Sequence, residues 1–165
     1  MADENFNLSQ DLLNELLEYR DGELFWKVSR PHVKKGQLAG RISDKGYWRI
    51  TLCNRIYKAH RLIFLMHKGY LPTEIDHIDG NKLNNRIENL REATRAQNIL
   101  NRGLMKTNTS GVKGVSWSKE RNKWEVQMYI DGKKHHVGRF DELEVAKTIA
   151  IAFRQQHHGE FANHG

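Results

Sequence analysis

The chain has 165 residues, enough for one ordinary domain or two small ones, and its mean hydropathy of -0.75 argues against membrane-spanning helices. Its single cysteine excludes an intramolecular disulfide and a cysteine-rich structural zinc site. The net charge is +7, and the excess is concentrated in residues 26–103, which carry 16 basic and six acidic side chains. Such a charge indicates either a solubilising surface or a polyanion partner, and its concentration favours nucleic acid.

The N-terminal stretch, MADENFNLSQ, is acidic and lacks the basic and apolar pattern of a signal peptide, so we expect a soluble protein of the reducing cytoplasm. An amphipathic helix is predicted over 8–22 because leucines recur at helical spacing. Ser9 is its expected N-cap, and Gly22 follows its expected end. Residues 23–28 have the composition of a strand.

An exposed connection and a hairpin are expected next. Residues 29–46 are rich in glycine and lysine, which is typical of a loop. Alternating apolar and polar residues predict strands over 47–53 and 56–60, joined by a turn at 54–55. A helix is predicted over 60–69 because its last residue, a glycine, terminates an apolar pattern of helical spacing.

A stretch of linker composition after residue 103, followed by a new pattern of strands and a helix, predicts two domains. The expected first domain is 1–103, residues 104–110 have linker composition, and the expected second domain is 111–163. The second domain has three alternating segments expected as antiparallel strands, joined in one place by an Asp-Gly turn at 131–132. An amphipathic helix is then expected over 141–159, capped by Asp141 and Glu144.

Residues 74–90, EIDHIDGNKLNNRIENL, concentrate carboxylates, a histidine and carboxamides. Asp76 and His77 are adjacent, so they point to opposite sides of an extended strand unless the backbone turns, and Asp79 with Gly80 supplies a turn. Hard cations such as Mg²⁺ take carboxylate, carboxamide, phosphate and water oxygens. A histidine, whose ordinary pKa is about 6.5, suits proton removal from water. The segment is therefore either a densely hydrogen-bonded turn or a metal site beside a base.

The wider segment 57–102, YKAHRLIFLMHKGYLPTEIDHIDGNKLNNRIENLREATRAQNILNR, resembles the HNH nuclease module of phage- and intron-borne homing endonucleases. Its DHIDGN…NN…NL…N core carries the resemblance, which covers most of 45–102. The resemblance implies an α+β fold in which the first domain is a ββα-metal nuclease. It also implies a divalent cation, Mg²⁺ or another such as Mn²⁺, with no structural zinc.

The resemblance also implies a role for each matching residue. Asp76 is the first metal ligand, and His77 is the general base that activates water. Asn89 braces the loop and orients the base, and it is counted with His77 among the catalytic residues. Asn98, expected one turn into a helix capped by Thr94, is the second metal ligand. The other polar residues of the loop are expected to form its turn: Asp79, Asn81, Asn84 and Asn85. For His60, packing or a phosphate contact is favoured over catalysis.

Residues 110–163 resemble the ethylene-responsive-factor (apetala-two) type of DNA-binding domain, through KGV at 113–115, KW at 123–124, VGRF at 137–140 and the final HHGEFAN. In that family a three-stranded antiparallel sheet packed on one helix lies in the DNA major groove. Alternation assigns an apolar face to Val115, Trp117, Trp124, Val126, Met128 and Val137, packed on Ala146, Ile149, Ala150 and Phe153. The expected DNA-binding residues are Ser116, Ser118, Lys119, Gln127, Tyr129, Lys134 and His136. A structural or protein-binding sheet is the alternative.

Together these expectations describe a metal-dependent endonuclease that hydrolyses phosphodiester bonds in double-stranded DNA and anchors on the duplex through its sheet domain. The resemblance further implies a phage-type enzyme working in the cytoplasm of a bacterial host. A DNA-binding regulator with a non-catalytic nuclease-like module is the principal alternative, and an RNA-processing nuclease is a third. Oligomeric state and recognition sequence stay open.

Overall fold

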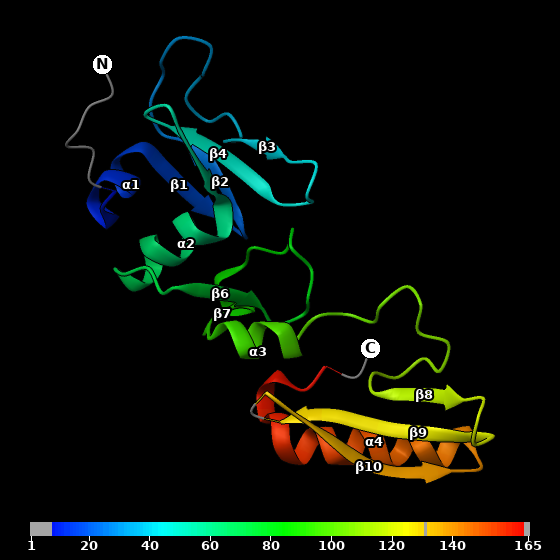
Figure 1. Ribbon diagram of the computed structural model, residues 1–165. Coiled ribbons are helices and arrows are strands. Elements are labelled where there is room, and N and C mark those ends of the chain that lie inside the picture. Colours follow the sequence, from blue (N-terminus) through cyan, green and yellow to red (C-terminus); the bar gives the residue numbers. More distant parts are fainter. Residues whose placement is uncertain (1–7, 131, 164–165) are drawn as a thin grey trace. The chain divides into compact units, whose positions relative to one another are not determined.

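The computed structural model describes residues 8–130 and 132–163 (Figure 1). The chain divides into two compact units, Met1–Ala93 and Thr94–Gly165, each with its own core. The acidic start of the chain and the aspartate of the turn expected at 131–132 lie outside the described residues. The architecture mixes helices with several small antiparallel sheets, in agreement with the α+β expectation. No helix within the described ranges is long and apolar enough to cross a membrane.

The first unit begins with helix α1 (Gln10–Leu16), and Ser9 caps it by accepting a hydrogen bond from the backbone amide of Leu12. The helix is shorter than expected from the leucine pattern. Residues 17–20 instead form strand β1 (Leu17–Arg20), paired with β2 (Glu23–Trp26). Asp21 and Gly22 both have positive φ, so this Asp-Gly pair makes a hairpin turn rather than a helix end. The helix prediction over 17–20 was therefore wrong.

A second sheet contains β3 (Arg41–Ile42), β4 (Trp48–Leu52) and β5 (Arg55–Lys58) in that order. Its hairpin turn lies at Cys53 and Asn54, which both have positive φ, one residue earlier than expected. Helix α2 (Ala59–Lys68) follows and ends at Gly69 in the left-handed conformation, as the glycine predicts. Figure 1 shows β3 and β4 side by side, with the long loop between β2 and β3 beyond them.

The core of the first unit lies between α1, α2 and the two sheets. Helix α2 contributes more of it than any other element, because five consecutive residues of α2, 62–66, are buried. Leu13 of α1, Leu24 of β2 and Ile50 of β4 are fully buried against the same cluster. The strand that carries Asp76 and His77 follows this buried helix after a short connection.

That strand, β6 (Glu74–His77), pairs antiparallel with β7 (Leu90–Ala93). The connection between them contains a 3₁₀ turn, η1 (Ile87–Asn89). The hydroxyl of Tyr19, on β1, accepts a hydrogen bond from the backbone amide of Ile87 at 3.1 Å. The polar segment 74–90 is thus an ordered hairpin with a long loop, attached to the rest of the unit by β1.

The second unit begins with α3 (Arg95–Leu100), and Thr94 and Gln97 form the expected capping box at its start. Strands β8 (Val115–Ser118), β9 (Lys123–Ile130) and β10 (Lys133–Phe140) form a sheet with β9 in the centre. Helix α4 (Leu143–His158) packs on one face of this sheet, and a 3₁₀ turn, η2 (Gly159–Phe161), follows it. A three-stranded antiparallel sheet on one helix is the arrangement expected for 111–163.

Two of the side chains assigned to the apolar face of this sheet and helix are exposed. Trp117 and Ile149 are 39% and 37% exposed, whereas Val126 and Ala150 are fully buried. Trp117 lies near the end of the short strand β8, where it contacts the ring of Trp124 across the strand pair at 5.1 Å. The buried cluster of this small unit holds smaller side chains instead, and the assignment of Trp117 and Ile149 to the core was wrong.

The start of α4 also differs from expectation. Its N-cap is Glu142, which makes no side-chain capping hydrogen bond. Asp141, the expected cap, instead forms an ion pair with Lys123 at 2.9 Å. The predicted capping box was therefore wrong, because a cross-strand cation competes for the same carboxylate.

Candidate active site

The β6–β7 hairpin places Asp76 and His77 at the end of a buried strand. Their exposed fractions are only 5% and 6%. The strand ends at His77, whose carbonyl oxygen accepts a hydrogen bond from the amide of Gly80 and closes a tight turn. Gly80 has a φ of +72°, a conformation that favours glycine there. The turn foreseen from Asp79 and Gly80 is therefore present, directly after the two candidate residues.

The imidazole of His77 is held by Asn85. Its Nε2 atom lies 3.0 Å from Oδ1 of Asn85, and both side chains are buried. With a carboxamide oxygen as acceptor, Nε2 carries the proton and Nδ1 keeps the lone pair. Burial lowers the pKa of His77, against the opposing effects of the Asn85 hydrogen bond and of the Asp79 and Asp76 carboxylates. The ring is therefore a neutral, oriented base at pH 7.

A second histidine packs against the first. The ring of His60, near the start of α2, meets the ring of His77 edge to face, with centroids 4.9 Å apart. His60 is 5% exposed, and burial, followed by the charge of His77, lowers its pKa to about 3. Its other ring neighbour is Tyr47, at 5.7 Å. His60 therefore forms an uncharged wall beside His77, which agrees with the packing role expected for it.

Asp76 faces the opposite side of the strand and binds Arg91. The Nε and Nη2 atoms of Arg91 donate to Oδ2 of Asp76 at 3.0 and 2.8 Å. The two residues are directly opposite each other in the β6–β7 register. These two hydrogen bonds from Arg91 hold the buried carboxylate of Asp76 in one orientation. Arg91 was not singled out from the sequence, although its place in the strand after Asn89 could have indicated it.

Asn89 ties the two ends of the loop together. Its Nδ2 atom donates to Oδ1 of Asp79 at 2.9 Å and to the carbonyl oxygen of Asn84 at 2.8 Å, while its Oδ1 accepts from the amide of Asp79. Asn81 and Asn84 also donate to the Asp79 carboxylate. Although burial opposes it, these donors lower the pKa of Asp79. Asp79, Asn81 and Asn84 thus form the turn, as expected.

Asn85, for which the sequence indicated only a turn role, has a side chain that hydrogen-bonds the imidazole of the candidate base. Its signal was the pair Asn84-Asn85, in which one residue points outward to Asp79 and the other inward to His77. The first unit therefore places Asp76, His77 and Asn89 on one hairpin, with Asn85 beside His77. Asn98 belongs to the second unit, where it lies half-buried on α3 with its amide bonded to the Thr94 carbonyl.

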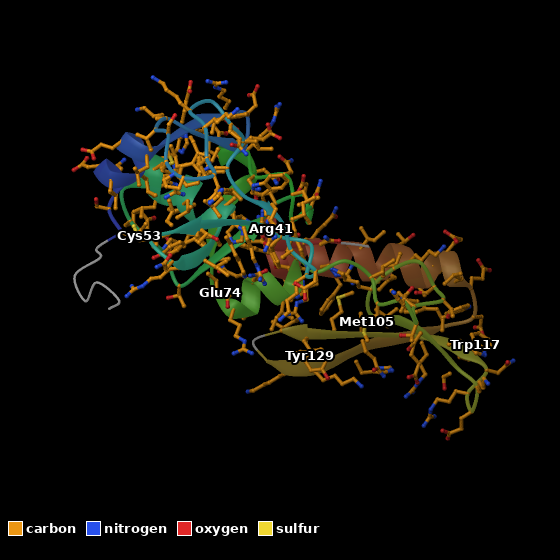
Figure 2. All side chains as sticks on the ribbon, turned by 90° about the horizontal axis from the view of Figure 1, so that it is seen from above. Arg41, Cys53, Glu74, Met105, Trp117 and Tyr129 are labelled. Atoms are coloured by element: carbon orange, nitrogen blue, oxygen red, sulfur yellow. The ribbon has the colours of Figure 1, made fainter. Side chains whose placement is uncertain are left out.

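The expected DNA-binding residues of the second unit lie on its sheet. Four are exposed on the strands: Ser116, Tyr129, Lys134 and His136. Lys119 is exposed just after β8, and Ser118 and Gln127 are half-buried. Figure 2 labels Tyr129 on β9, where it alternates with the buried Met128 and so projects away from α4.

A β-bulge changes which residues share this outer face. The β9–β10 register shifts between His136 and Gly138, so Arg139 lies opposite Glu125. Their side chains form an ion pair with Nε of Arg139 2.6 Å from Oε1 of Glu125. This hydrogen bond is the main cause that lowers the pKa of Glu125. The regular alternation used on the sequence missed Arg139 as a member of the face.

Comparison with known proteins agrees with the site. A model of the HNH endonuclease family matches residues 57–100. The chain is 47% identical over 138 residues to Protein 3.8 of Escherichia phage T7, a match that spans 84% of this chain and 92% of that protein. It is 36% identical over 106 residues to an uncharacterized HNH endonuclease of Acanthamoeba polyphaga mimivirus, spanning 62% of this chain and 54% of that protein. No solved structure matches the chain significantly.

Proposed function

This chain belongs to the family of phage T7 Protein 3.8 and contains an HNH endonuclease domain at residues 57–100, and from this premise we propose that it hydrolyses phosphodiester bonds in double-stranded DNA. The observation that carries the proposal is the orientation of His77. A buried imidazole is held through Nε2 by Asn85, so its proton-accepting atom is Nδ1. A neutral base fixed in this way at the end of a strand suits the activation of water.

In the proposed reaction, Nδ1 of His77 takes a proton from a water molecule as the water oxygen attacks phosphorus, and the bond from phosphorus to the leaving sugar oxygen breaks. The lowered pKa of His77 keeps the ring unprotonated at neutral pH, so no proton has to leave before the step begins. His60 keeps bulk solvent away from one side of the ring. The loop network around Asn89 and Asp79 holds the turn that carries His77, and thereby the direction of the ring.

A divalent cation such as Mg²⁺ would be held by the carboxylate of Asp76, because carboxylates supply the hard oxygen atoms that such a cation prefers. The role of Asn98 as a second ligand stays an expectation from the HNH resemblance. Arg91 donates to Oδ2 of Asp76, and a carboxylate has about four acceptor positions, so this ion pair is compatible with a metal bond. Within the described ranges no three His, Cys, Asp or Glu side chains form a metal cluster. The remaining ligands would be phosphate and water oxygens.

The bound cation would supply stabilisation of the negative charge that develops on the leaving oxygen. The protein's part is then to orient Asp76 through Arg91 and to fix His77 through Asn85. The exposed polar face of the second unit would anchor the enzyme on the duplex through contacts to phosphates and base edges. Lys119, Lys134 and Arg139 are cationic residues of this face, and Arg139 is paired with Glu125.

The test is incubation of supercoiled plasmid with the purified protein in Mg²⁺, in Mn²⁺ and in EDTA, with mapping of the product ends. We expect nicked or linear DNA in both metals and none in EDTA, while RNA of the same sequence stays intact. Binding to the plasmid without cleavage in any metal would favour the alternative, a DNA-binding regulator with a non-catalytic nuclease-like module. Cleavage of RNA but not of DNA would favour an RNA-processing nuclease.

A further inference from the structure

Three cationic side chains form one row across the sheet β3–β4–β5. Antiparallel pairing sets Arg41 opposite Arg49 and Arg49 opposite Lys58. Ile50 and Leu52 of β4 are fully buried in the core, so the alternation of the strand turns Arg49 to the other face. Residues directly opposite each other share a face, and the row therefore crosses the outer face of all three strands.

Repulsion between these three positive charges destabilises the folded protein when no anion is bound. Side chains directly opposite in antiparallel strands have Cβ atoms about 4.5–5.5 Å apart, and like charges at that spacing are destabilising. Within the described part of the chain, neither Arg41, Arg49 nor Lys58 takes part in an ion pair. Burial lowers the pKa of Lys58, and the charges of Arg61, Arg49 and Lys82 add to the effect, against the opposing charge of Glu74. An anion lying over the row would remove this repulsion.

A hollow of about 960 Å³ adjoins the row. Among the described residues, its lining includes Arg30, Arg41 and Arg49 against a single carboxylate, Asp44. The guanidinium of Arg30 stacks on the ring of Trp26 at 3.8 Å and donates to the carbonyl oxygen of Thr51 at 3.2 Å. These contacts hold Arg30 in place, and an ordered arginine loses less conformational entropy when it binds a phosphate.

The loop that walls the hollow is fixed where it meets β4. Gly40 has a φ of +93°, and a Cβ atom at this position would overlap the carbonyl oxygen of Arg49. The indole nitrogen of Trp48 donates to the carbonyl oxygen of Ala39 at 2.7 Å, beside the same glycine. The hollow is therefore built into the folded unit by a close backbone approach. Figure 2 labels Arg41 in this part of the first unit.

The row also leads toward the candidate base. Lys58 and Lys82 place their ammonium groups 4.3 and 4.8 Å from the ring centroid of Tyr47. Tyr47 packs against His60, and His60 against His77. Each of these residues belongs to the first unit. A polyanion on the row would thus extend to the neighbourhood of His77 without help from the second unit.

We propose that the outer face of the β3–β4–β5 sheet, with the row Arg41–Arg49–Lys58 and the adjoining hollow, binds the sugar-phosphate backbone of the duplex that His77 cleaves. The inference rests on the proposed function and adds a second DNA-contacting surface, inside the nuclease unit. Repeated cations beside a stacked arginine suit successive phosphates of one strand, because phosphate contacts position a duplex without reading its sequence. The surface would set which phosphate reaches His77.

The test compares the double variant R41Q/R49Q with a control, K27Q/K68Q, which removes the same charge from exposed positions of the first unit outside both the β3–β4–β5 sheet and the lining of the hollow. Affinity for a labelled duplex is measured by fluorescence anisotropy in EDTA across a salt series, and plasmid cleavage is measured separately in Mg²⁺. Since each lost phosphate contact reduces the salt slope by about 0.9, we expect the slope of R41Q/R49Q to be shallower by about 1.8. The control should keep the wild-type slope to within about half of one contact.

Thermal unfolding separates binding from folding. Removing two repelling arginines should leave the melting temperature equal to or above that of the wild type, because the repulsion within the row is relieved. Equal salt slopes for R41Q/R49Q and the control would overturn the inference, even if the wild type cleaves DNA. A reduced slope in a protein that cleaves nothing would support the surface and refute the proposed function. Loss of affinity for duplex RNA alone would also overturn the inference.

Discussion

Nε2 of His77 lies 3.0 Å from Oδ1 of Asn85, and this buried contact fixes both the direction and the tautomer of the candidate base. Asn85 is 4% exposed and lies in the loop that is closed by the hydrogen bond from Asn89 to Asp79. The loop therefore has two layers: an outer set of hydrogen bonds that shapes the turn, and one inner hydrogen bond that reaches the chemistry.

Replacing Asn85 by alanine should lower the DNA cleavage rate without abolishing DNA binding. The imidazole would lose the partner that selects its tautomer, and losses of roughly 10- to 100-fold are typical when a residue that orients an active-site group is removed. Leaving the Nε2 proton of His77 unsatisfied should also reduce the free energy of unfolding by about 1–3 kcal/mol. Single-turnover cleavage and urea denaturation measure the two effects. Asn81→Ala, in the outer layer, is the control, and an Asn85→Ala rate equal to wild type would contradict the assignment.

The stability of the protein should fall below pH 6.5 because of His60. An unfolded histidine binds a proton below about pH 6.5, whereas the folded His60, with a pKa of about 3, does not. The unfolded chain therefore binds more protons between these values, and the free energy of unfolding decreases as the pH falls. At pH 5 the contribution of His60 should be about 2 kcal/mol less than at pH 7.

Urea denaturation of the wild type and of His60→Gln at pH 7 and pH 5 measures this contribution, because the titrations of other groups are common to both proteins. The variant should show a smaller loss of stability between the two pH values. Equal losses in both proteins would mean that His60 does not stay neutral in the folded state.

Replacing Glu125 by glutamine should strengthen binding to duplex DNA. Glu125 holds Arg139 through a 2.6 Å ion pair on the expected DNA-binding face of the second unit. Without the carboxylate, Arg139 is available to a phosphate, and the salt slope should become steeper by about 0.9. Glu120→Gln removes the same charge from an exposed turn and is the control in a fluorescence anisotropy titration. A matching increase in Glu120→Gln would assign the effect to net charge instead of to Arg139.

Local sequence signals predicted much of the fold. Ser9 and Thr94 cap helices as their side chains indicate, and Gly69 ends α2. The failures occurred where two signals competed at one place. Leu16 and Leu17 continue a helical leucine pattern, but Asp21-Gly22 forms a hairpin turn, and pairing with β2 outweighs the propensity of residues 17–20.

The candidate site was predictable in its residue types but not in its contacts. The resemblance indicated Asp76, His77 and Asn89, and the first unit places all three on one hairpin. It could not indicate that Asn85 turns inward, because adjacent asparagines are equivalent in a sequence and differ only once the loop closes. Arg139 was missed because a β-bulge interrupts the two-residue period on which the prediction relied. The roles in metal binding and DNA contact stay predictions.

The most direct test of His77 as the general base is single-turnover cleavage by His77→Ala in Mg²⁺, measured beside His67→Ala. His67 is exposed on α2, with its Nδ1 against the carbonyl oxygen of Ile63, and it serves as a matched histidine outside the site. We expect His77→Ala to lose at least about 100-fold in rate, the contribution typical of a general base, with unchanged affinity for DNA, and His67→Ala to keep the wild-type rate. Cleavage by His77→Ala at the wild-type rate would contradict this role of His77.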